Sequence, residues 1–314
     1  MLKDKNGKVT ALLKIVAVFI VLLIAVIAVH ASFIIGANMY YSMTSGDPQS
    51  ASDKATALLG SIEAQVAIVI VQNIVFILIA YLFYTKVDRK KFSPDSFGLR
   101  VRRDTLKLFG LGMLLDVVFI GSLIGISILT GQMSIVTTGF SVYPLSTIVM
   151  SFVLLLVATL AVGFGEEILY RGYIQSSLME KFSMPVALCL ASFVFVISHA
   201  VTHVQPIYFI SIFVLALVFG YLFVVTRSLY VPIGFHFLED FMVFNVFVSG
   251  ESGLGGSPIF ILTEPAKIYL FNMDMGTWPD AIALGVGLAM LAAIYVYDKK
   301  INASNSEASL STGA

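Results

Sequence analysis

The sequence predicts an all-α integral membrane protein, a bundle of about eight transmembrane helices with both the N- and C-termini in the cytoplasm. Hydrophobic residues make up 58% of the 314, charged residues make up only 12%, and the mean hydropathy is +0.95. This composition excludes a soluble domain and a disordered chain. Two further observations point to the same fold class: apolar runs of membrane-spanning length, and an asymmetric distribution of basic residues between them.

Eight apolar runs are each about 20 residues long, the length at which a helix crosses the hydrocarbon core of a bilayer. They cover residues 12–34, 62–84, 108–130, 146–169, 184–205, 206–226, 231–249 and 280–297. With the N-terminus inside, all 19 Lys and Arg residues except Lys54 and Lys267 fall in cytoplasmic segments. The positive-inside rule therefore supports an even number of spans, and we expect a multi-pass protein of a bacterial cell membrane.

The chain divides into four parts, with no internal repeat and no second soluble domain. Residues 1–107 hold the first two spans and a basic cytoplasmic loop, 108–250 hold five spans, 251–300 hold an outer loop and the last span, and 301–314 form a small polar tail. We expect the tail to be disordered. In the outer loop we expect an interfacial helix that places Tyr269, Phe271 and Trp278 among the lipid headgroups.

Ionisable side chains at membrane depth are costly, so they indicate function. They gather in the second half of the chain. The set consists of Glu166, Glu167, Arg171, His199, His203, His236, Glu239 and Asp240. The i,i+4 spacing of Glu167 and Arg171 predicts a salt bridge. Glu166 lies about 100° away around the helix, so we expect its carboxylate to remain without this cation.

The same spacing joins two further pairs. His236 and Asp240 are i,i+4, so the aspartate can fix the tautomer of the imidazole or stabilise its charged form. Phe195 and His199 also share one helix face.

A helical hairpin is predicted to bring Glu166 to His199. The stretch "EKFSMP" (180–185) holds the turn, and residues equally distant from the turn of an antiparallel hairpin lie at similar height. Glu166 and His199 are each about 16 residues from its middle, roughly 25 Å along each helix. A carboxylate that faces an imidazole can hold and deprotonate a water, and a second oriented histidine can donate to an oxyanion. Together they suggest hydrolysis of an amide bond in a membrane-associated substrate.

Three short motifs resemble those of the CAAX prenyl protease and bacteriocin-processing family, also called the CPBP or abortive-infection family. They are "EEILYR" (166–171), "FVISH" (195–199) and "HFLED" (236–240), and the resemblance covers about residues 145–250. It implies an intramembrane endopeptidase. The peptide substrate would be membrane-associated, of a prenylated CAAX type or a leader type, and the lipid bilayer is the other partner. The zero net charge gives no indication of a nucleic-acid partner.

The resemblance also implies roles for individual residues. Glu166 would be the general base and His199 would help to bind the attacking water. Glu167, Arg171 and Phe195 would support the site, and His236 with residue 240 would stabilise the oxyanion. Asp240 stands where the eukaryotic prenyl proteases carry Asn. Because an ionised aspartate cannot donate a hydrogen bond, we expect Asp240 to orient His236, and His236 to be the donor.

Family members are commonly labelled metalloproteases, and a glutamate-dependent interpretation without metal also exists. No cofactor is certain from the sequence, and a divalent metal such as zinc stays an open alternative. Glu166, His199 and His236 are the candidate ligands. His203, four residues after His199, is a weaker candidate because "HAVTH" lacks the glutamate of HExxH and lies near the outer end of its span.

Other kinds of site fit less well. "GESG" (250–253) resembles the motif of a rhomboid-type serine protease, but no histidine follows it. The GxGD motif of aspartyl intramembrane proteases is absent. A cysteine–histidine pair is excluded because Cys189 lies about 15 Å along one helix from His199. A proton- or ion-coupled transporter could use the same buried cluster, although no repeat or paired broken helix indicates one. A non-catalytic membrane scaffold or immunity protein is the second alternative.

Overall fold

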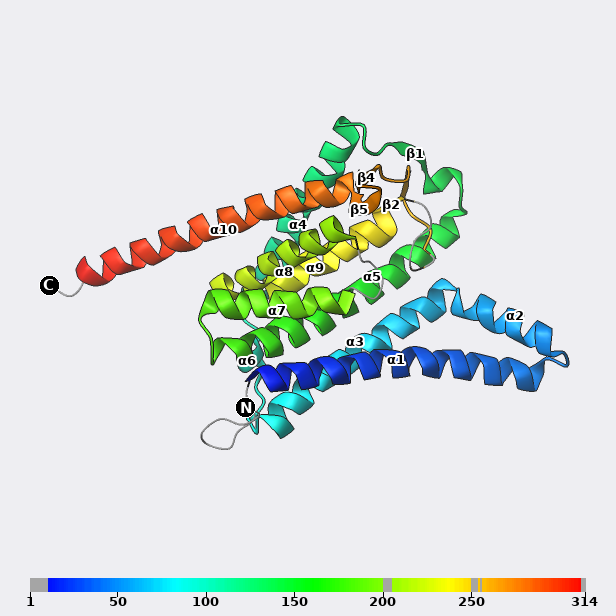
Figure 1. The fold of residues 1–314 in the computed structure, drawn as a ribbon, viewed down its shortest axis with the longest axis horizontal. Coiled ribbons are helices and arrows are strands. Elements are labelled where there is room, and N and C mark those ends of the chain that lie inside the picture. The colour runs from blue at the N-terminus through cyan, green and yellow to red at the C-terminus, as the bar shows by residue number, and fades with distance from the viewer. Residues whose placement is uncertain (1–10, 200–204, 250–253, 255, 312–314) are drawn as a thin grey trace.

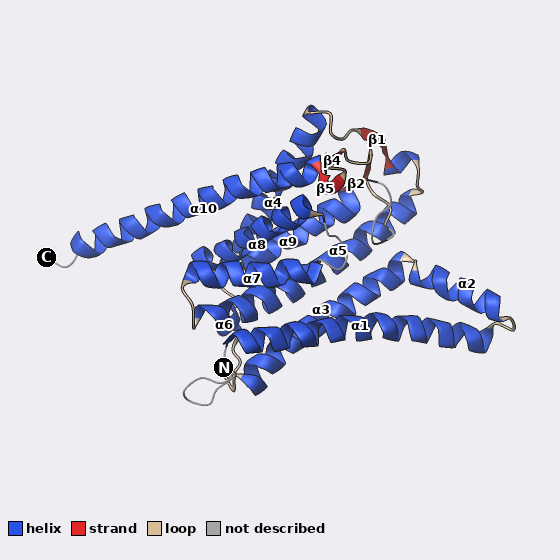
Figure 2. Ribbon diagram, in the orientation of Figure 1, coloured by secondary structure: helices blue, strands red, loops and turns tan. Residues whose placement is uncertain are grey.

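The computed structural model describes residues 11–199, 205–249, 254 and 256–311, which form a helical bundle with short strands at one end (Figure 1; Figure 2). The α-helices are α1 (Ala11–Thr44), α2 (Pro48–Leu59), α3 (Ile62–Leu82), α4 (Thr105–Leu129), α5 (Leu145–Glu167), α6 (Ser176–Met179), α7 (Met184–His199), α8 (Pro206–Thr226), α9 (Tyr230–Phe241) and α10 (Trp278–Ser311). The strands are β1 (Ile135–Thr138), β2 (Phe247–Ser249), β3 (Phe260–Leu262), β4 (Lys267–Leu270) and β5 (Met273–Thr277).

Short segments of other helix types extend or connect these elements. The π-helical segments are η1 (Phe83–Val87), η4 (Ile168–Gln175) and η5 (Met242–Val246), and the 3₁₀ turns are η2 (Pro94–Phe97) and η3 (Gly139–Ser141). The three π-helical segments each lengthen a helix that the sequence predicts: η1 continues α3, η4 continues α5 and η5 continues α9. Segment η4 joins α5 to α6, so Leu145–Met179 is one helical rod of 35 residues, about 52 Å long at 1.5 Å per residue.

Six helices of the described chain are long and apolar enough to cross a membrane, which confirms a largely helical multi-pass membrane protein. The other two predicted spans are helical but shorter. Helix α7 has 16 residues up to His199, and residues 200–204 of its predicted span, 184–205, lie outside the described residues. Helix α9 has 12 residues and continues through η5 before the chain turns into β2. The count of eight full-length spans is therefore not confirmed.

The bundle has two different ends. Helix α1 begins and helix α10 ends on the same side in Figure 1. The basic loop lies there too, since Lys14 of α1 pairs with Asp88, and Lys90 pairs with Glu180 next to α6. The strands gather at the opposite side (Figure 2). We call these the terminal end and the strand end.

Two predictions about non-membrane segments were wrong. The stretch predicted as a disordered tail is helical up to Ser311, since no glycine after Gly287 and no proline after Pro279 interrupts α10. The segment expected to form an interfacial helix instead forms the antiparallel β4–β5 hairpin. Its two-residue turn has Phe271 and Asn272 at positive φ, as tight hairpin turns require.

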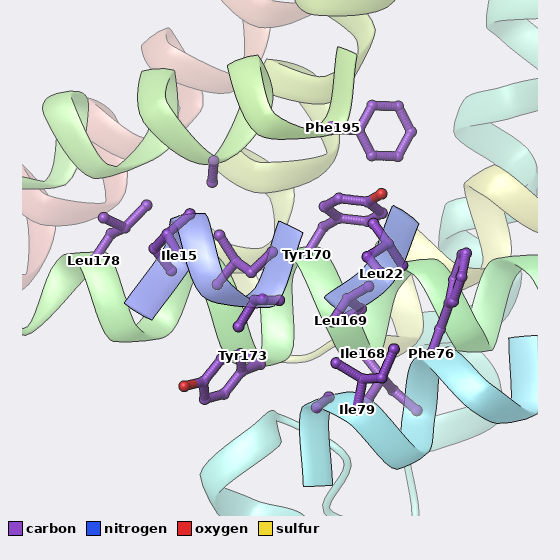
Figure 3. Close-up of a cluster of buried hydrophobic side chains, with 14 of the residues drawn as sticks. Ile15, Leu22, Phe76, Ile79, Ile168, Leu169, Tyr170, Tyr173, Leu178 and Phe195 are labelled. Atoms are coloured by element: carbon purple, nitrogen blue, oxygen red, sulfur yellow. The ribbon is translucent and has the colours of Figure 1, made fainter. Parts of the chain in front are cut away.

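The largest core cluster surrounds the rod formed by α5, η4 and α6. Figure 3 shows side chains from α1, α3 and α7 packed around it. Ile168 to Tyr173 are buried on every side, because hydrophobic residues of three other helices meet them there. The labelled members include Ile15, Leu22, Phe76, Ile79, Leu169, Tyr170, Tyr173, Leu178 and Phe195.

Helix α9 fits between α4 and α5 because glycines replace larger side chains at the contacts. A Cβ atom at Gly112 of α4 would overlap the carbonyl oxygen of Val231, and one at Gly234 of α9 would overlap that of Phe109. On the other side, a Cβ at Gly163 of α5 would lie 3.1 Å from the carbonyl oxygen of Ile233. Small residues permit such close helix contacts in membrane proteins. The contacts set the position of His236 on α9.

Candidate active site

Glu166 lies in the last turn of α5 and faces two histidines. Its Oε2 atom lies 3.8 Å from Nε2 of His199 on α7 and 3.9 Å from Nε2 of His236 on α9. The turn between α6 and α7 falls within the predicted stretch, so the predicted facing of Glu166 and His199 is present. Glu166 Oε2 is buried and has no hydrogen-bond partner among the described residues.

These atoms border a cavity of about 320 Å³. Helices α3, α5, α7, α8 and α9 and segment η5 contribute to its walls. Its lining combines the candidate polar groups with apolar side chains. The lining residues are Val69, Thr159, Val162, Glu166, Phe195, His199, Tyr208, Ile212, Leu215, Phe219, His236, Glu239, Asp240, Val243, Phe244 and Leu254. A mostly apolar pocket with a few convergent polar groups is a typical small substrate site.

Glu167 belongs to a different network. Its Oε1 atom accepts hydrogen bonds from Arg171 Nη1 at 2.8 Å and from His236 Nδ1 at 2.9 Å. The predicted Glu167–Arg171 salt bridge is therefore present, with both side chains almost completely buried. Arg171 also donates from Nη2 to the carbonyl oxygen of Ala216. Arg171 thus compensates the charge of Glu167, while Glu166 pairs with no Lys or Arg within the described part of the chain.

Asp240 lies within ion-pair distance of His236 but makes no direct hydrogen bond that would orient it. Asp240 Oδ2 lies 3.8 Å from His236 Nε2, too far for a direct hydrogen bond. Glu167 takes this role instead through Nδ1. The reason is the close contact of α5 and α9 at Gly163, one turn before Glu167, which a count of residues along α9 alone does not reveal.

Two phenylalanines enclose the charged groups. The rings of Phe195 and Phe219 lie 4.5 and 5.2 Å from the Arg171 guanidinium carbon. Phe219 also stacks on the His236 imidazole, with ring centroids 5.1 Å apart and 24° between the planes. Phe195 was predicted as a supporting residue, whereas Phe219 was missed. Its position in an apolar run of α8 carries no polar signal.

The hydrogen bonds also define what the two histidines present to the cavity. His199 Nδ1 lies 2.8 Å from the carbonyl oxygen of Phe195, and His236 Nδ1 lies 2.9 Å from Glu167. Because these acceptors require N–H at Nδ1, each neutral imidazole offers the Nε2 lone pair to the cavity. Separations of 3.8–3.9 Å from Glu166 exceed a direct hydrogen bond and suit groups that share a water.

The same donor atoms can be tested against a metal. Ligand atoms around tetrahedral zinc lie about 2.0–2.1 Å from the ion, and so about 3.3 Å from one another. Glu166 Oε2 is farther than this from both imidazole nitrogens. Across the described part of the chain, no group of three His, Cys, Asp or Glu side chains has metal-ligand spacing. His203 lies outside the described residues.

The remaining polar residues near the site are acidic. Glu239 and Asp240 both line the cavity, and Glu239 was noticed in the sequence without a role. Asp116 of α4 is fully buried, and neither of its carboxylate oxygens has a hydrogen-bond partner among the described residues.

Residues 148–242 match the protein family described as type II CAAX prenyl endopeptidase, Rce1-like. The matched segment contains Glu166, His199, His236 and Asp240, and it confirms the resemblance that the three motifs indicate. The comparisons with curated proteins and with solved structures gave no match.

Proposed function

We propose, from the premise that residues 148–242 match the CAAX prenyl endopeptidase-like family, an intramembrane endopeptidase in which Glu166 activates the attacking water. One observation carries the proposal. The Glu166 carboxylate, which has no hydrogen-bond partner among the described residues, faces Nε2 of His199 and of His236 at the edge of a buried cavity.

The hydrolytic step can be written with these groups. A water hydrogen-bonded between Glu166 Oε2 and His199 Nε2 loses a proton to Glu166, and its oxygen attacks the carbonyl carbon of the scissile peptide bond. The carbonyl oxygen becomes an oxyanion. His236, in its imidazolium form, donates to that oxyanion from Nε2. The C–N bond then breaks as Glu166 returns the proton to the amine leaving group.

The surrounding groups have positioning roles in this scheme. Glu167 holds His236 through Nδ1, so that Nε2 points to the cavity in both protonation states. Arg171 forms an ion pair with Glu167, and Phe195 and Phe219 fix the guanidinium between their rings. Preorganised donors of this kind stabilise developing charge without reorganisation during the reaction.

The substrate is a peptide or protein in the membrane, as the protease family implies. Both a prenylated CAAX-type peptide and a leader-type peptide remain candidates. The test is a comparison of membrane and released peptides from cells that express the wild type, the Glu166→Gln variant or the matched surface variant Glu63→Gln. We expect the wild type and Glu63→Gln to release the same new peptide ends, and Glu166→Gln to release none.

The outcome also separates the alternatives. Identical peptide profiles for the wild type and Glu166→Gln would contradict the endopeptidase proposal. Proton or ion flux through protein in liposomes, lost in Glu166→Gln, would instead support a transporter. Absence of both cleavage and flux would leave the scaffold interpretation.

A further inference from the structure

A second cavity, of about 380 Å³, lies at the strand end of the molecule. We call it the outer cavity. Helices α4 and α8, segment η5 and strands β2, β4 and β5 contribute to its walls. Its lining residues are Leu123, Ile124, Met133, Gln205, Tyr208, Val243, Phe247, Ser249, Pro265, Lys267, Asp274, Gly276, Thr277, Pro279 and Asp280.

The outer cavity shares part of its walls with the cavity of about 320 Å³ that Glu166 lines. Tyr208, in the first turn of α8, and Val243, in η5, line both. These two side chains therefore separate the outer cavity from the space in front of Glu166. A substrate chain that passes between them would run from the catalytic groups toward the strand end.

In the opposite direction the packing is closed. Beyond Glu166 toward the terminal end, Arg171 donates to the carbonyl oxygen of Ala216, and Gln175 donates to that of Gly220 at 2.9 Å. Both side chains are almost completely buried. A Cβ atom at Gly220 would overlap the side chains of Leu188 and Gln175, so η4, α7 and α8 are in close contact here. This leaves the strand end as the direction in which the site continues.

The lining of the outer cavity suits a polypeptide rather than a purely apolar chain. Gln205 Oε1 is buried and has no hydrogen-bond partner among the described residues, so it can accept from a backbone N–H. Lys267 and Asp274 form an ion pair at 3.2 Å. The backbone N–H of Gly276 and the Lys267 ammonium hold the pKa of Asp274 below its usual value. Apolar side chains such as Leu123 and Phe247 complete the lining.

Strand β2 adds a second reason to expect an extended peptide. It lies at the edge of the three-stranded sheet, whose order is β1-β3-β2. Phe247 and Ser249, two residues apart and so on the same face of β2, both line the outer cavity. An edge strand offers backbone groups with which an extended peptide can pair.

We infer that the outer cavity is a substrate subsite that binds an extended polypeptide segment leading from the scissile bond to the strand end. The inference rests on the proposed endopeptidase function and narrows its substrate class. The substrate is a chain that continues for several residues past the cut on that side, and not one that ends directly beyond the cut.

The test uses purified protein in lipid nanodiscs and three internally quenched peptides with the same hydrophobic centre. One has no extension, one carries about ten polar residues at its N-terminus, and one carries them at its C-terminus. We expect the wild type to show a lower KM for one extended peptide. Ser249→Phe, which fills the outer cavity alone, should raise that KM about tenfold, leave kcat unchanged, and leave the unextended peptide unaffected.

Two further variants control the result. Gln205→Leu removes the buried acceptor, and because this side chain makes no capping hydrogen bond, the fold should persist while the KM of the extended peptide rises. Ser134→Phe places the same new ring on an exposed serine that lines neither cavity, and should change nothing. Equal effects of Ser249→Phe and Gln205→Leu on all peptides, or no effect on any, would overturn the subsite. Failure of the wild type to cleave any peptide would instead overturn the proposed function, and the subsite with it.

Discussion

Glu166 and Glu167 are neighbours in the chain but have different surroundings. Glu166 faces the cavity and two imidazole nitrogens, whereas Glu167 is fully buried between Arg171 and His236. Replacing one of them should therefore have a different consequence from replacing the other. We propose Glu166 for the chemical step, whereas Glu167 holds Arg171 and His236 through hydrogen bonds.

We expect Glu167→Gln to lower the stability of the folded protein. Removing one member of a buried ion pair leaves the other charge uncompensated, at a cost of about 3–5 kcal/mol. The apparent thermal midpoint in detergent should fall for Glu167→Gln, and should partly recover in the double variant with Arg171→Met, which removes the unpaired cation. Equal stability of the wild type and Glu167→Gln would contradict this role.

The donor geometry around Glu166 leads to a prediction about metal. Because the Glu166 and histidine atoms are spaced more widely than zinc ligands, we expect purified protein treated with a chelator to keep its cleavage rate. Metal analysis should give less than one equivalent of zinc. Loss of activity with the chelator, restored by added zinc, would show that these side chains close around an ion in the active enzyme.

Contacts between residues of one helix or one hairpin could be predicted from the sequence, whereas contacts between distant segments could not. The Glu167–Arg171 pair and the level of Glu166 with His199 followed from counting along helices, because helical rise and spacing are fixed. The bond between Glu167 and His236 did not, because the two residues are 69 apart and meet through packing of α5 on α9. Phe219 was missed for the same reason.

Among the helices, α9 contributes three of the polar residues that line the cavity at the candidate site. It carries His236, Glu239 and Asp240, and it contacts α4 and α5 through glycines on both sides. These contacts leave no room for an added methyl group, so the position of His236 depends on them.

We expect Gly112→Ala to separate α4 from α9, because the new Cβ would overlap the Val231 carbonyl oxygen. Overpacking of this kind costs about 1–3 kcal/mol, and a displacement of His236 by about 1 Å can lower the rate about 100-fold. The matched variant is Gly121→Ala on the same helix, where no atom lies within 4 Å of the new Cβ. Both activity and thermal midpoint should fall only for Gly112→Ala, and equal behaviour of the two variants would contradict the role of this contact.

The helices of the bundle were predictable from apolar runs, but the strands were not. Each strand has only three to five residues, too few for an alternating pattern. The pairing of β1 with β3 is also distant in sequence, as between Ile135 and Leu262. The short helices α7 and α9 were predicted with the right start. The end of α9 depends on strand β2, into which the chain continues through η5.

In the whole molecule, the terminal end and the strand end differ in charge and in packing. The terminal end carries most basic residues and is closed by packed side chains beyond Glu166, and the strand end carries the outer cavity. Both ends of the described chain lie on one side (Figure 1), as an even number of membrane crossings requires.

This arrangement predicts opposite exposure of two surface positions. Two variants test this in a Cys189→Ser background. Gly46→Cys places a cysteine between α1 and α2 toward the strand end, and Lys91→Cys places one in the basic loop. A membrane-impermeant maleimide added to intact cells should label Gly46→Cys alone, and both after permeabilisation. Labelling of Lys91→Cys in intact cells would contradict the orientation with the basic loop in the cytoplasm.

The central claim is that Glu166 is the base that activates water. Its most direct test is the kcat of purified Glu166→Gln in nanodiscs, on a peptide that the wild type cleaves, with Glu63→Gln as the matched control. We predict a fall of about 10²–10⁴-fold with an unchanged thermal midpoint, since Glu166 Oε2 has no hydrogen-bond partner to lose among the described residues. A kcat equal to that of the wild type would contradict the claim.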